Sequence, residues 1–166
     1  MTEPDPPETR PVLVAVDFSA DSSRALVWAA RQAEMEDAPL IILHVVHDPA
    51  ASPGFYQKPE ENWLRPLADV ARDMMDDFLA TAKAEHPDLP ALASAAVRLV
   101  SGLPGGRIAE VASETGARLV VIGSRGRTGL QSILLGSVAQ RVAQICSAPV
   151  VIVKASPNES RQEPAA

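Results

Sequence analysis

Three glycines and a serine near the C-terminal end of the chain have the types and spacing of a phosphate-binding loop. Gly123 and Gly126 follow an apolar segment, and Gly136-Ser137 precede a segment with helical periodicity. Glycine lets the backbone turn sharply and approach a ligand with no Cβ in the way. Gly136-Ser137 would present free N–H groups at a helix N-terminus, where the dipole favours an anion. The pattern predicts an anion site, and phosphate fits it best.

The distribution of charge supports this location. The segment from Thr115 to Asn158 contains no Asp or Glu, although the whole chain has 21, and it carries five basic residues, among them Arg125 and Arg127. The segment is therefore at +5 and the remainder of the chain at −11. A buried strand and helix would also lack acids, so the charge locates a candidate site without identifying it.

Other kinds of chemistry find less support in the sequence. There is no Walker-type Gly-x-x-x-x-Gly-Lys-Ser/Thr, and the turn Val16–Ser19 lacks the dinucleotide glycine fingerprint. Asp17 at that turn is better suited to bonding a ribose or capping the turn than to catalysis. His44 is interpreted as a core or flanking imidazole and Cys146 as a small buried hydrophobe. No nucleophile–base–orienter set can be assembled, so the sequence supports at most slow hydrolysis; whether a metal binds stays open.

Composition sets the broad class of protein. The length of 166 residues suits one domain, and 46% hydrophobic with 22% charged residues excludes a wholly disordered chain. A net charge of −6 argues against a general nucleic-acid binder, and a single Cys excludes an internal disulfide framework. The acidic, Pro-rich start is unlike a signal peptide, and no apolar run reaches the ~20 residues of a membrane span. We expect a cytoplasmic protein without nucleic-acid or membrane partners.

Five segments are predicted as β-strands that position the glycine loop. Four are continuous, apolar and rich in β-branched residues, as in parallel strands covered on both faces; they are residues 12–16, 40–46, 119–122 and 150–153. The fifth, Ala95–Val100, alternates and carries Arg98, which suits an edge strand.

Helical periodicity separates these strands. Apolar spacing predicts four helices, around Leu26–Ala33 with Ser19 as N-cap, Leu67–Ala82 ending at His86-Pro87, Ile108–Ala112 and Val138–Ile145. The alternation predicts right-handed crossovers and an α/β fold with an open, doubly wound parallel sheet and helices on both faces. The predicted single domain spans residues 11–154, between disordered tails at 1–10 and 155–166. The three-proline connection 48–62 has no assigned role.

Several motifs together resemble the ATP-binding subgroup of the universal stress protein family. The resemblance covers about residues 11–154 and rests on Val14–Ser19, Leu43–Val45, Val121–Gly126, Leu135–Val138 and Ala148–Val153. The subgroup's nucleotide motif is Gly-x2-Gly-x9-Gly-Ser/Thr, and Gly123, Gly126, Gly136 and Ser137 meet every spacing. The chain departs from the family at Arg118, where Asp is frequent.

The resemblance implies a fold, a ligand and an assembly. The fold is a Rossmann-like, adenine nucleotide alpha hydrolase-like sheet of five strands in the order 3-2-1-4-5. The implied cofactor is ATP, with Mg²⁺ left open, and the implied partner is a second copy paired through the last strand, Val150–Val153. The site residues that it implies are Ala15, Val16, Asp17, Val45, Ile122, Gly123, Gly126, Gly136, Ser137 and Val138.

Each group of these residues has an implied role. The first-strand end would contact adenine and ribose, and the Val45 backbone would meet the adenine edge. Ile122 and Gly123 would border the ribose and phosphates. The phosphates would be cradled by Gly126, Gly136, Ser137 and Val138. Arg125 stands where the family varies, so its phosphate contact is inferred from its charge alone.

The function expected from the sequence is that of an ATP-binding universal stress protein acting as a nucleotide-dependent stress-response or regulatory switch. One alternative is a dimeric scaffold or chaperone-like module that does not need ATP. Another is a slow ATPase or self-phosphorylating protein.

Overall fold

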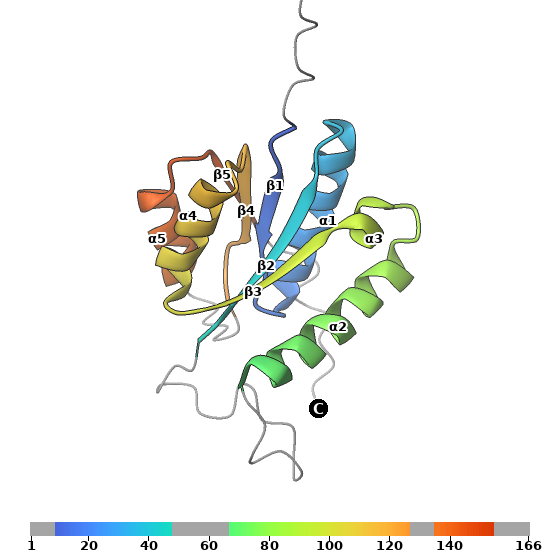
Figure 1. Ribbon diagram of the computed structural model, residues 1–166, viewed down its shortest axis with the longest axis horizontal. Helices are drawn as coiled ribbons and strands as arrows, with labels where there is room; N and C mark the ends of the chain where they lie inside the picture. Colours follow the sequence, from blue (N-terminus) through green and yellow to red (C-terminus); the bar gives the residue numbers. More distant parts are fainter. Residues whose placement is uncertain (1–8, 48–66, 127–134, 155–166) are drawn as a thin grey trace, which may run out of the picture.

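A five-stranded parallel sheet forms the centre of the molecule (Figure 1). The computed structural model describes residues 9–47, 67–126 and 135–154. The strand order is β3-β2-β1-β4-β5, which confirms the predicted fold class and the order 3-2-1-4-5. The strands are β1 (Val12–Ala15), β2 (Leu40–Val46), β3 (Ala96–Ser101), β4 (Leu119–Gly123) and β5 (Val150–Val153).

Helices cover both faces of the sheet, as Figure 1 shows. They are α1 (Ala20–Met35), α2 (Leu67–Glu85), α3 (Ala91–Ser94), α4 (Pro104–Glu114) and α5 (Ser137–Ile145). The first three pack on one face and the last two on the other. Helix α3 was not predicted, because four residues are too few to show a periodicity; its buried Leu92 completes the core under α1.

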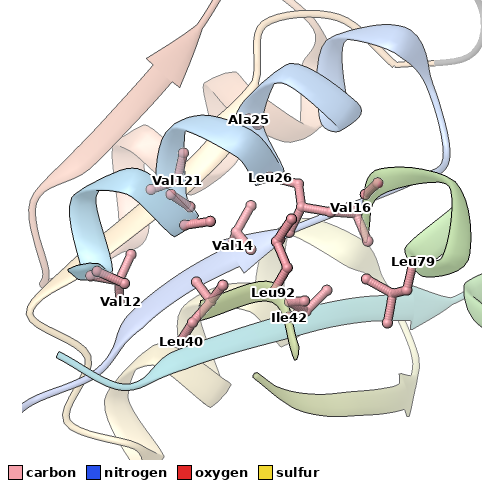
Figure 2. Close-up of a cluster of buried hydrophobic side chains, with 14 of the residues drawn as sticks. Val12, Val14, Val16, Ala25, Leu26, Leu40, Ile42, Leu79, Leu92 and Val121 are labelled. Atoms are coloured by element: carbon pink, nitrogen blue, oxygen red, sulfur yellow. The ribbon is translucent and has the colours of Figure 1, made fainter. Parts of the chain in front are cut away.

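Burial on both faces explains why β1 is apolar without alternation. Val12 and Val14 point into a core cluster with Leu26 of α1 and Ile42 of β2 (Figure 2). Leu13 points into a second cluster beneath α4 and α5. All four residues of β1 are buried, as expected of the central strand of a doubly wound sheet. The carboxyl end of β1 is therefore fixed by packing on both sides.

The edge strand β3 and the first described residues lie at the periphery of the domain. Val97 and Arg98 are exposed on the edge strand β3, as predicted. Arg10, at the end of the expected tail 1–10, donates from its Nε to Gly116 O at 2.8 Å and from its Nη2 to Ala117 O at 3.2 Å. The expected tail 155–166, the connection 48–62 and Arg127 lie outside the described residues. None of the helices described is both long and apolar enough to cross a membrane.

Candidate functional site

The turn after β1 places Asp17 against Gly126, in the loop that follows β4. Asp17 Oδ1 accepts hydrogen bonds from the Ser19 hydroxyl and from the Ser19 N–H, the latter at 3.1 Å. Ser19 is the N-cap of α1, as predicted, since its Oγ accepts from Ser22 N–H at 3.2 Å. The other carboxylate oxygen, Oδ2, lies where a Cβ on Gly126 would approach to 2.9 Å. One oxygen of Asp17 thus caps the turn while the other faces the loop after β4.

Aromatic packing holds this turn in an unusual conformation. Phe18 has a φ of 65°, a left-handed value that is rare for a bulky residue. Its ring lies 4.4 Å from the His44 ring and 5.6 Å from the Phe78 ring, measured between centroids. His44 is buried and its Nδ1–H donates to Val16 O at 2.8 Å, which confirms the core imidazole. Residues from β2 and α2 therefore position Asp17.

Gly123 has a different role from the one that the sequence suggested. We expected it to let the backbone approach a ligand, but a Cβ there would lie 2.9 Å from the Asp21 carbonyl carbon and 3.0 Å from Ser22 N. The residue is buried against the first turn of α1. Its missing side chain lets β4 and α1 pack closely, and the loop that follows starts from this contact.

Two polar residues that the sequence analysis missed connect this loop to the rest of the site. Asp21 and Ser124 are both buried, and Ser124 Oγ–H donates to Asp21 Oδ2 at 3.0 Å. The Arg125 N–H donates to the same oxygen at 3.2 Å, and Arg125 Nε lies 3.5 Å from it. An acid in a first helical turn is a common sequence feature, and nothing in the spacing reveals a partner 103 positions away.

The start of α5 meets the same loop. Gly136 N–H donates to Ser124 O at 2.7 Å, so this N–H is not free, contrary to our expectation. A Cβ on Gly136 would lie 3.3 Å from Ser124 O, so the two segments approach closely. Gly136 is the N-cap of α5, and the N–H groups of the three following residues, Ser137 to Ala139, have no acceptor within the helix. These groups, rather than that of Gly136, could donate hydrogen bonds to an anion.

Three further predicted residues lie near the carboxyl ends of the strands. Ala15 pairs with Leu43 of β2 and Ile122 of β4, and Val45 lies two residues further along β2. The side chains of Ala15, Val45 and Ile122 are buried in the second core cluster, where Val138 also packs. Contacts with a ligand at these strand positions would come from backbone atoms. Within the described residues, no three or more His, Cys, Asp and Glu side chains group as a metal site.

Comparison with known proteins gives a consistent family assignment. The model of the universal stress protein family matches residues 8–154. Universal stress protein YxiE of Bacillus subtilis is 32% identical over 147 residues, which cover 86% of this chain and 97% of that protein. Universal stress protein Rv2623 of Mycobacterium tuberculosis is 32% identical over 150 residues, and the chain spans about half its length, 47%. A solved universal stress protein in complex with cAMP is 28% identical, with a TM-score of 0.60 over 89% of this chain and 98% of that one.

Proposed function

Because the chain belongs to the universal stress protein family, we propose that it binds an adenine nucleotide, with ATP as the principal ligand, and acts as a nucleotide-dependent switch in a cytoplasmic stress or regulatory response. The observation that carries the proposal is that three segments distant in the sequence meet at the carboxyl ends of the strands. Asp17 after β1 lies beside Gly126, which follows β4. Gly136, before α5, is hydrogen-bonded to Ser124 of the same loop. Parallel α/β sheets bind ligands at the carboxyl ends of their strands.

The phosphate side of the proposed site consists mainly of backbone donors. The N–H groups of Ser137 and Val138 lie in the first turn of α5, where the helix dipole also favours an anion. Gly126 has no Cβ, which leaves room for Asp17 Oδ2 beside the loop, 2.9 Å from where a Cβ would lie. Arg125 adds positive charge, part of which Asp21 compensates. Backbone N–H groups therefore contribute most of the proposed phosphate recognition, as in other anion-binding loops.

The nucleoside side would be formed by the ends of β1 and β2. Asp17 Oδ2 can accept a hydrogen bond from a ribose hydroxyl while Oδ1 stays bonded to Ser19. Backbone groups of Ala15, Val16 and Val45 would contact the base. The relative bound to cAMP supports an adenine nucleotide as the ligand class. A Mg²⁺ ion at this site would be held chiefly by the ligand's own phosphates, as magnesium commonly is.

The proposal is tested by direct binding. Isothermal titration calorimetry of the purified protein with Mg-ATP, ATP, cAMP and adenosine should show saturable binding below millimolar ligand, strongest for ATP. Mass spectrometry of ligand released from freshly purified protein should identify an adenine nucleotide. Absence of ATP binding at millimolar concentration would contradict the proposal and favour a scaffold that works without a nucleotide. Time-dependent formation of ADP would favour a slow ATPase or self-phosphorylating protein instead.

We also propose that the protein is a homodimer paired through β5. This strand is at an edge of the sheet, and its four residues are apolar and only half-buried in the single chain. An apolar edge strand without a partner is an aggregation hazard. Light scattering after size-exclusion chromatography should therefore give twice the chain mass of 17.6 kDa. A mass equal to one chain at micromolar concentration would contradict the pairing.

A further inference from the structure

Asp21 has contacts that a residue serving only to start a helix would not need. It lies in the first turn of α1 and is 7% exposed. Its Oδ2 accepts hydrogen bonds from Ser124 Oγ–H at 3.0 Å and from Arg125 N–H at 3.2 Å, and Arg125 Nε is 3.5 Å away. Its Oδ1 faces Arg24 Nη1 at 3.4 Å. One carboxylate oxygen is thus dedicated to the loop after β4, and the other to the helix's own arginine.

Physical chemistry explains why this arrangement fixes the loop. A buried carboxylate is costly unless it is paired and hydrogen-bonded, so its partners are held strongly in place. Hydrogen bonds to a charged acceptor are also roughly twice as strong as neutral ones. The first turn of a helix favours the negative charge. Leu26 and its neighbours pack α1 into the core. The Asp21 carboxylate therefore has a fixed position, and its hydrogen bonds hold the start of the loop after β4 against the helix.

Ser124 is also hydrogen-bonded to β5 and to Gly136 at the start of α5. Its N–H donates to Val153 O at 2.8 Å and its C=O accepts from Gly136 N–H at 2.7 Å. The Cβ position of Gly136 would lie 3.7 Å from Gly126 N, so the two glycines are close neighbours next to the bond between Gly136 and Ser124. Removing the bonds to Asp21 would leave Ser124 held by its backbone alone.

We infer that Asp21 is a positioning residue for phosphate recognition: through its Oδ2 contacts with Ser124 and Arg125 it sets the relation between Gly126 and the N-terminus of α5. The inference rests on the proposed nucleotide function and adds a residue outside the glycine motif. Asp21 accepts a hydrogen bond from the Arg125 N–H and compensates part of the positive charge of the Arg125 side chain. It would therefore act on the phosphates through the loop.

The test compares ATP with adenosine in matched variants. Asp21→Ala should weaken ATP binding about 10-fold, because two hydrogen bonds to a charged acceptor are lost. Adenosine affinity should change by less than about twofold, because adenosine does not use the phosphate loop. Asp21→Asn keeps an acceptor at the Oδ2 position and should restore ATP affinity to within about threefold of wild type. Arg24→Ala, which removes the contact with Asp21 Oδ1 and leaves the Oδ2 contacts with Ser124 and Arg125 in place, should bind ATP like wild type.

The outcomes separate this inference from the proposed function. If the wild-type protein binds neither ATP nor adenosine, the proposed function fails. If wild type binds and Asp21→Ala loses ATP and adenosine equally, or binds ATP normally, the positioning role is wrong. Failure of Asp21→Asn to restore binding would also overturn it. Should Asp21→Ala not fold by circular dichroism, Ser124→Ala replaces it; about threefold selective loss of ATP is then expected, and no loss refutes the inference.

Discussion

Replacing Gly126 by valine should raise the dissociation constant for ATP at least ~100-fold, equivalent to about 2.8 kcal/mol. A Cβ at this position would lie 2.9 Å from Asp17 Oδ2, and the branched γ carbons would extend further into the space beside the loop. Asp17 cannot simply move aside, because its other oxygen is bonded to Ser19, the N-cap of α1. The substitution therefore displaces both sides of the proposed site at once. Calorimetry with ATP and with adenosine measures the effect.

Gly106→Val is the matched control for this variant. Gly106 is exposed on α4, and a Cβ there would meet nothing within 4 Å. The same chemical change should leave ATP affinity unaltered and cost little stability, because valine is no worse than glycine in a helix. Wild-type ATP affinity in Gly126→Val, with the control also normal, would remove Gly126 from the proposed phosphate loop.

Gly123→Ala should lower the free energy of unfolding by about 1–3 kcal/mol, the usual cost of adding a carbon to a well-packed core. Its Cβ would lie 2.9 Å from the carbonyl carbon of Asp21 and 3.0 Å from the backbone nitrogen of Ser22. These are backbone atoms of α1, so no side-chain rotation relieves the overlap, and β4 must separate from the helix. Urea denaturation followed by circular dichroism measures the change.

The same variant should also weaken ATP binding, because separating β4 from α1 moves Asp21 away from Ser124. Gly106→Ala is the control, and it should be neutral or stabilising by up to about 1 kcal/mol, since alanine is the better helix former. An unchanged urea midpoint for Gly123→Ala would show that the close packing of β4 on α1 is not tight enough to exclude a methyl group.

The sequence predicts the sheet well because strand burial leaves a local signal. Continuous apolar runs such as residues 40–46 coincide with a strand buried on both faces. The order of the strands followed from the family resemblance, and the structure confirms it. Helix α3 escaped prediction because its four residues are too few for a periodicity, and its position depends on Leu92 entering a core formed by distant elements.

The candidate site is only partly predictable for a related reason. The spacing of Gly123, Gly126 and Gly136 is visible in the chain, but what each missing Cβ faces depends on the fold. Gly123 faces a helix and Gly126 faces Asp17, a difference that no spacing rule distinguishes. The Asp21–Ser124 bond joins residues 103 positions apart and depends on how closely α1 and β4 pack, so it becomes visible only in three dimensions.

Phe18 makes the turn after β1 part of the cooperative unit of the core. Its left-handed backbone costs about 1–3 kcal/mol, and the ring contacts with His44 and Phe78 offset that cost. Opening the turn alone would lose those contacts and keep the strain, so we expect the turn to unfold together with β2 and α2 rather than by local fraying. Substitutions that loosen Phe78 would then weaken nucleotide binding without touching any residue of the candidate site.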